Sequence, residues 1–272
     1  MGKDRNSYSK TDLEATFMRM KEDHMLNGQL KPAYNVQIAV ENYFIVHGYI
    51  SNDRTDYNTL IPVLEKHQKA FGSVLEEMTA DSGYCSEKNL LYLKEKGIES
   101  YIKLQDHEKR KTRAYAEDIS KYYNMRVEVF EDEQFYICHD GRELRHIRTE
   151  TKEQNGYTQT FEVYGCADCS GCEHKARCLY KYNAEKDTER NKVMKINEQW
   201  DELREKSHAN IQSERGILKR QTRSIQTEGH FGDIKENENF RRFNYRSADK
   251  VYKEFMLYAI GRNINKYYRF LN

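Results

Sequence analysis

The chain contains no long apolar run and has no hydrophobic stretch at its start. No run approaches the roughly 18 apolar residues that a membrane-spanning helix needs. The first ten residues, MGKDRNSYSK, contain nothing like the hydrophobic segment of a signal peptide. We therefore expect a cytoplasmic protein without a membrane partner. In that compartment the six cysteines are expected to be thiols or metal ligands rather than disulfides.

Net charge is also almost absent, at +1 over 272 residues, but its distribution is uneven. Residues 215–272 contain 13 Lys and Arg against 6 Asp and Glu, a balance of +7, which leaves −6 for the rest of the chain. Tyr and Phe are interleaved with these cations. A basic, aromatic segment of this kind suits a polyanion such as nucleic acid, and a solvated helical face is the alternative.

The first hundred residues carry the pattern of a layered fold. Alternating apolar residues predict a hairpin of strands over 36–40 and 44–50, and a helix that reaches residue 70. A strand over 74–80, a helix over 86–96 and a strand over 98–104 form a crossover unit, whose strands should be parallel neighbours. Together they predict an α/β fold with a mixed sheet flanked by helices.

Residues 105–215 break this rhythm. Strands punctuated by the turn pairs Asp140-Gly141 and Asn155-Gly156 predict a small β-meander, and the polar run over 185–213 is expected to be helical. We interpret 105–215 as a β-rich, Cys-rich insertion. It separates a first core part, 1–104, from the C-terminal core helices, 216–272.

The insertion carries a run of cysteines with the spacing of a metal site. Cys166, Cys169, Cys172 and Cys178 can surround one ion with four thiolates, which suits zinc. An iron–sulfur cluster or free thiols are the alternatives, although the usual cluster run has three residues before the last Cys and a Pro after it. Cys138 lies one strand away and could replace one of the four.

Two carboxylates stand out by position. Asp81 falls at the carboxyl end of a predicted central strand, where ligands of α/β sheets bind, and a plain turn residue is the alternative. Glu228 shares a helical stripe with Leu218 and Ile225, which predicts that it faces inward. Lys235 follows about two turns later on nearly the same side. An ordinary surface glutamate is the alternative for Glu228.

These residues lie in segments that resemble the DDE transposases of bacterial insertion sequences, in the branch with a Cys-rich insertion before the catalytic Glu. The matching segments are Thr79 to Tyr84, Arg223 to Lys235 and Phe240 to Phe243, with support from Thr11 to Met18, Tyr34 to Gln37 and Cys166 to Cys178. The resemblance spans nearly the whole chain. It implies a ribonuclease H-like fold whose acids hold two divalent ions.

The resemblance assigns roles residue by residue. Asp81 corresponds to the second catalytic acid and Glu228 to the third, and both would bind Mg²⁺ or Mn²⁺. The expected partner is double-stranded DNA at transposon ends, with a homodimer as a further expectation. The expected DNA-binding residues are Arg223, Lys235, Arg241 and Arg242.

The first catalytic acid is the main departure from the family. It normally lies on the first sheet strand, before the segment that contains Asp12, and only ten residues precede Thr11 here. Asp12 is the nearest substitute, but its segment matches a different family element. We therefore expect a transposase catalytic domain that is truncated and inactive as it stands. A ribonuclease H-like nuclease and a zinc-stabilised DNA-binding protein without catalysis are the alternatives.

Overall fold

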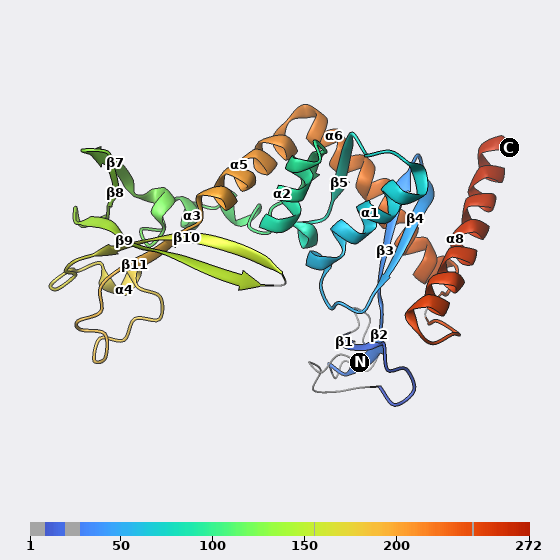
Figure 1. Ribbon diagram of the computed structural model, residues 1–272, viewed down its shortest axis with the longest axis horizontal. Helices are drawn as coiled ribbons and strands as arrows, with labels where there is room; N and C mark the ends of the chain where they lie inside the picture. The colour runs from blue at the N-terminus through green and yellow to red at the C-terminus, as the bar shows by residue number, and fades with distance from the viewer. Residues whose placement is uncertain (1–8, 20–27, 155, 241) are drawn as a thin grey trace. The chain divides into compact units, whose positions relative to one another are not determined.

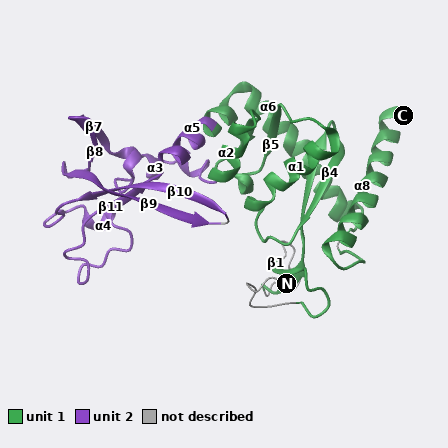
Figure 2. Ribbon diagram, viewed as in Figure 1, with its two compact units in different colours: residues 1–104, 207–272 green, residues 105–206 purple. Residues whose placement is uncertain are grey.

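The computed structural model describes residues 9–19, 28–154, 156–240 and 242–272 (Figure 1). It divides into two compact units, residues 1–104 with 207–272 and residues 105–206 (Figure 2). Helices and strands occur together, so the predicted α/β class is confirmed, while the three-part division made from the sequence stays a prediction. None of the helices among these residues combines the length and apolar character that a membrane crossing requires.

The first unit contains the predicted hairpin. β3 (Asn35–Glu41) pairs antiparallel with β4 (Phe44–Ser51), as the alternation of apolar residues predicts. The turn residues Asn42 and Tyr43 both have positive φ, 49° and 70°, which is the backbone of a tight two-residue hairpin. A second, shorter hairpin precedes it, made of β1 (Thr16–Arg19) and β2 (Leu30–Ala33).

The crossover unit is also confirmed. After α1 (Leu60–Phe71), β5 (Glu77–Ala80), α2 (Glu87–Glu95) and β6 (Glu99–Ile102) follow in order, and β5 and β6 are parallel neighbours. The predicted single mixed sheet is not formed. Among the described residues, β3 pairs only with β4 and β5 only with β6, so each keeps one free edge.

The C-terminal part of this unit is helical. It comprises α6 (Glu214–Arg223), a π-helical segment (Ser224–Glu228), α7 (Gly229–Gly232), a second π-helical segment (Asp233–Asn237) and α8 (Ala248–Leu271). Val251 and Phe255 of α8 form a buried cluster with Ile50 and Ile234. Gly48 permits this packing, because a Cβ there would lie 3.0 Å from Met256 Sδ and 3.2 Å from the Phe255 ring.

The second unit is an antiparallel sheet in the order β11-β10-β9-β8-β7. Its strands are β7 (Arg126–Phe130), β8 (Glu133–Ile137), β9 (Glu143–Gln154), β10 (Tyr157–Cys166) and β11 (Val193–Ile196), and its short helices are α3 (Arg113–Ala116) and α4 (Lys175–Cys178). The helix predicted over 185–213 is wrong in its first part. That part contains β11, whose Met194 and Ile196 are buried, and only α5 (Glu198–Gln212) is helical.

Candidate active site

Asp81 lies at the carboxyl end of β5, as predicted. Its backbone is extended and begins a short 3₁₀ turn, Ser82–Tyr84. Its Oδ1 accepts a hydrogen bond from the Ser82 backbone N–H at 2.6 Å, and the side chain is 58% exposed. Oδ1 is therefore held by the turn, and Oδ2 is left for partners from other elements.

Glu228 ends the first π-helical segment and is 59% exposed, so the prediction that it faces inward is wrong. Leu218 and Ile225, its partners in the predicted stripe, are exposed as well. The side of α6 that packs toward β5 carries cations instead, because Arg215 and Lys219 both pair with Glu77. The side of α6 toward β5 therefore carries ion pairs, and the apolar stripe is exposed.

Arg223 brings the two carboxylates together. Its guanidinium donates to Glu228 Oε1 at 3.0 Å, and it lies 3.6 Å from Asp81 Oδ2. Ser224 Oγ donates to the other Glu228 oxygen at 3.0 Å. Asp81 and Glu228 are 147 residues apart in the sequence, and they meet at one cation, Arg223, which lies five residues before Glu228. They converge as the sequence predicts, although on a surface rather than in a core.

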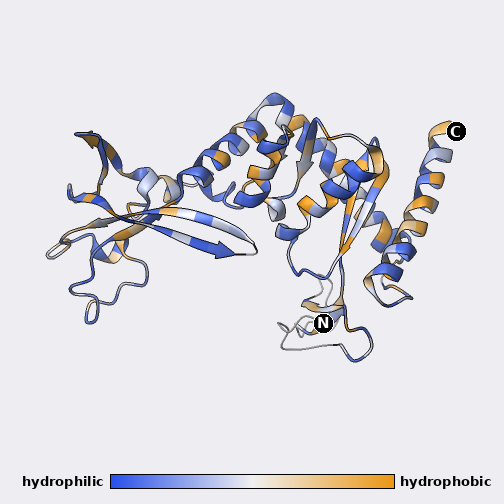
Figure 3. Ribbon diagram, in the orientation of Figure 1, coloured by the Kyte–Doolittle hydropathy of each residue, from blue (hydrophilic) through white to orange (hydrophobic). Residues whose placement is uncertain are grey.

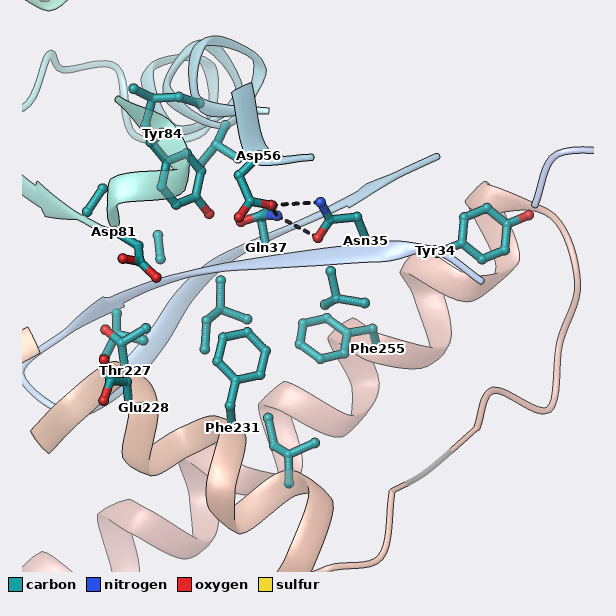
Figure 4. Close-up of a pocket in the computed structure, with 18 of the residues that line it drawn as sticks. Tyr34, Asn35, Gln37, Asp56, Asp81, Tyr84, Thr227, Glu228, Phe231 and Phe255 are labelled. Carbon is teal, nitrogen blue, oxygen red and sulfur yellow. Dashed lines mark hydrogen bonds between the residues drawn. The ribbon is translucent and has the colours of Figure 1, made fainter. Parts of the chain in front are cut away.

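Asp81 and Glu228 line a large hollow in the first unit, of about 2290 Å³ (Figure 4). We call it the central hollow. Its walls are the whole of β3, the whole of β5 and the helical segment around Glu228. The basic residues Lys235 and Arg242 also line it, whereas Arg241 falls outside the described residues.

Asp56 is a further carboxylate on this hollow, and the sequence analysis did not single it out. Its Oδ1 accepts hydrogen bonds from the side-chain amides of Asn35 at 2.7 Å and Gln37 at 2.8 Å (Figure 4). A Cβ at Gly83 would lie 2.9 Å from Asp56 Oδ2, so glycine permits this approach. The available signal was the alternation of two amides on β3, which places both on one side of the strand.

Tyr84 lies among these charges. Burial raises the pKa of its phenol, the carboxylates of Asp56 and Asp81 raise it further, and Arg223 opposes them. Tyr84 is therefore a neutral hydroxyl at physiological pH. It can donate a hydrogen bond but is not a base.

Asp12 has a structural role. Its Oδ2 accepts from the Tyr34 hydroxyl at 2.9 Å and from the Ser247 backbone N–H at 3.1 Å, while Glu14 accepts from the Ala248 N–H. The two acids therefore satisfy donors at the start of α8. Burial raises the pKa of Asp12, but these hydrogen bonds lower it more, so the net shift is downward. Its contribution to stability is present at neutral pH and is lost as the pH falls through the lowered pKa.

The cysteines of the second unit form a partly buried group. Cys166 and Cys169 are each 8% exposed and pack in one apolar cluster, against which Cys138 is packed. Burial raises the pKa of the Cys166 thiol to about 11, with help from Cys169. The Lys192 backbone N–H donates to Cys169 Sγ at 3.4 Å. Among the described residues, no group of three or more His, Cys, Asp or Glu is arranged to hold a metal ion, so the zinc site stays a prediction.

Carboxylates that converge at the end of a parallel strand pair, next to basic side chains, define a candidate site for metal-assisted chemistry on a phosphodiester. Residues 137–268 match the family model described as "Transposase DDE domain". This segment belongs to that family, which confirms the resemblance to DDE transposases and supports a transposase-type function acting on DNA. The matched segment includes Glu228 and the cysteine run, while Asp81 precedes it. No curated protein and no solved structure matches the chain.

Proposed function

We propose that this chain is the catalytic part of the transposase, with a ribonuclease H-like fold, in which Asp81 and Glu228 hold a divalent ion against transposon-end DNA. The observation that carries the proposal is the contact of Arg223 with both carboxylates. Side chains that share one cation are close enough to share another. Their oxygens are the ligands that Mg²⁺ prefers, and their exposure leaves room for the waters that the ion keeps.

Two carboxylates fit one ion rather than two. No third acid joins them in ligand geometry among the described residues. A bound ion would supply Lewis-acid stabilisation and a more acidic water at a phosphodiester. The chain itself would position the DNA, with Lys235 and Arg242 attracting phosphates toward the carboxylates across the central hollow.

The free edges of β3 and β5 support the ribonuclease H-like fold. Both strands line the same hollow along their full length, and each is paired on its other side only. A strand placed between them could hydrogen-bond to both edges and join the hairpin and the parallel pair into one mixed sheet. The resemblance places the first catalytic Asp on such a strand. We therefore attribute the absence of a third carboxylate ligand to the missing strand between β3 and β5. We expect the 272-residue chain to be inactive.

DNA binding by this surface should depend steeply on salt. Among the described residues, neither Lys235 nor Arg242 is paired with a carboxylate, so both are available for phosphates. Replacing both by Ala should weaken duplex binding about equally for all sequences and reduce the salt slope by about one per residue. The matched control is Lys69→Ala with Lys96→Ala, which removes the same charge from exposed sites away from the hollow. Fluorescence titrations at several salt concentrations measure the slope. An unchanged slope would contradict the assignment.

Zinc is proposed as a structural ion of the second unit. The spacing of Cys166, Cys169, Cys172 and Cys178 motivates it, and four thiolates suit a closed tetrahedral site. Pure protein should contain about one zinc per chain by metal analysis. Cys172→Ser should lower that content, and Cys138→Ser should not. The reverse pattern would make Cys138 the fourth ligand, while a brown iron chromophore or metal-free protein would exclude zinc.

A further inference from the structure

The segment that carries Glu228 is helical but irregular. A π-helical turn, Ser224–Glu228, is followed by four α-helical residues, Gly229–Gly232, and by a second π-helical turn, Asp233–Asn237. Turns of this kind are rare and occur mostly at functional sites. Because the helical period changes on both sides of Gly229–Gly232, the direction of the Glu228 side chain depends on what the segment is attached to.

Two side chains that flank Glu228 attach the segment to one residue of the β3–β4 turn. His230 Nε2 donates to the Tyr43 carbonyl at 2.9 Å, and Gln226 Oε1 accepts from the Tyr43 N–H at 3.3 Å. Residues 226 and 230 are four apart and share one side of a helix, whereas residue 228, two positions from each, points to the other side. Glu228 therefore faces Asp81 while the opposite side of its helix is attached to the hairpin (Figure 4).

Helix α8 holds Tyr43 in place. Polar residues interrupt the apolar ones along this helix, and several of them reach the hairpin (Figure 3). Lys266 Nζ lies 5.0 Å from the centre of the Tyr43 ring, and the Phe270 ring packs edge-on against it at 6.0 Å. Two residues further along the hairpin, the Asn263 amide donates to the Ile45 carbonyl at 2.8 Å and accepts from the Ile45 N–H at 2.9 Å. Tyr43 is therefore a fixed point for the segment that carries Glu228.

His230 is 5% exposed and is held in one tautomer. Its Nε2 carries the hydrogen, because the Tyr43 carbonyl can only accept. Its Nδ1 is the acceptor, because Arg262 Nη2, 3.2 Å away, can only donate, and this same nitrogen donates to Asp233 Oδ2 at 3.1 Å. Burial lowers the pKa of the imidazole, and the charges of Arg262 and Lys266 lower it further against the opposing effects of the Tyr43 carbonyl and Asp233. His230 is thus a neutral donor with a fixed direction.

We propose that His230 is a positioning residue for Glu228: its hydrogen bond to Tyr43, with that of Gln226, sets the direction in which the Glu228 carboxylate meets Asp81. The inference rests on the proposed function, in which these two carboxylates hold a divalent ion. His230 does not line the central hollow, so it acts through the backbone of the helix and not by touching the ion or the DNA. Only a side chain that places a donor at the same point can replace it.

Binding of Mn²⁺ alone to the full chain, followed by electron paramagnetic resonance, tests this role. His230→Asn is too short to reach the Tyr43 carbonyl. It should weaken binding at Asp81 and Glu228 by about 10-fold or more, the loss typical of removing a group that orients a metal ligand. His230→Gln, whose amide nitrogen reaches about as far as Nε2, should bind Mn²⁺ as the unmodified chain does. The Asp81→Asn chain measures binding elsewhere, which is subtracted.

Leu93→Ala is the matched control for lost stability. Leu93 is a core residue of α2 that is 1% exposed and does not line the hollow. This variant should unfold more easily, because it leaves a cavity, and should keep its affinity for Mn²⁺. Equal affinities in His230→Asn and His230→Gln would overturn the positioning role. So would a loss of affinity in Leu93→Ala as large as that in His230→Asn.

Hydrogen exchange separates the role of His230 from the proposed function. In the metal-free chain, the amides of residues 224–232 should exchange about 2- to 10-fold faster in His230→Asn, the change expected for the loss of one hydrogen bond. They should exchange at the unmodified rate in His230→Gln. A chain that shows this pattern but binds no Mn²⁺ at Asp81 and Glu228 would reject the ion site and support the attachment by His230. Unchanged exchange in His230→Asn would overturn the inference, whatever the result with Mn²⁺.

Discussion

A chain extended at its N-terminus by one β-strand that ends on an aspartate should cleave transposon-end DNA with Mg²⁺ or Mn²⁺, whereas the 272-residue chain should not. This is the expected result if the central hollow is the place of a missing strand. The added strand should match β3, which has seven residues, and continue into a segment like Asp-Gly-Thr. Its carboxylate would complete a set of three acids, the number that two bridged ions need in this class of site.

The matched control is the same extension with Asn in place of the added Asp. It should fill the hollow and raise stability to denaturant equally, because the strand hydrogen bonds are the same, but it should not cleave. Cleavage by the unextended chain would contradict the proposal that a strand is missing from the central hollow. In that case Asp56→Asn is the next variant to assay, since Asp56 lines the same hollow. An extended chain that binds DNA and never cleaves would favour the DNA-binding alternative.

In the extended chain, Asp81→Asn and Glu228→Gln should each reduce cleavage by at least about 10²–10³-fold, the loss typical of removing one electrostatic stabiliser of a transition state. Both changes keep the size of the side chain and remove the charge that would hold the ion. DNA binding should be retained or slightly stronger, because a negative charge next to the phosphates is lost.

Glu236→Gln is the control for this pair. It removes the same charge from the same C-terminal segment, at an exposed residue that does not line the hollow. Gel assays of cleavage and fluorescence titrations of binding, made on the same preparations, separate the two effects. Near-normal cleavage by Asp81→Asn or by Glu228→Gln would show that the substituted residue has no catalytic role. Equal losses in binding and cleavage would indicate a DNA contact instead.

The sequence predicts much of the first unit because local patterns decide it. The alternation of apolar residues along β3 and β4 and the order of β5, α2 and β6 are confirmed. Each of these elements is specified by its own residues and its immediate turn. Asp81 was found in the same way, because the end of a strand is visible in the sequence.

The exposure of Glu228 could not be predicted from the local pattern, because the contacts of α6 are made with residues far away in the sequence. Glu77 lies about 140 residues before Lys219, and their ion pair lies where α6 packs toward β5. The π-helical turn that follows also interrupts the 3.6-residue period on which the stripe was based. Asp56 was missed for a similar reason, since its amide partners lie on another element.

The first unit is made of two segments, residues 1–104 and 207–272, with the second unit between them in the sequence. This order affects how the first unit forms during synthesis. Its hairpin is made before the second unit, but α8, which covers β4, is made after it. At about 5–20 residues per second, translation of residues 105–206 alone takes roughly 5–20 s. During that interval the apolar face of β4 and the open edges of β3 and β5 have no covering element from the C-terminal segment. Unpaired edges and uncovered apolar faces are the sites at which nascent chains associate. The apolar face of β4 is therefore accessible to chaperones that bind exposed strands until α8 is made and covers it.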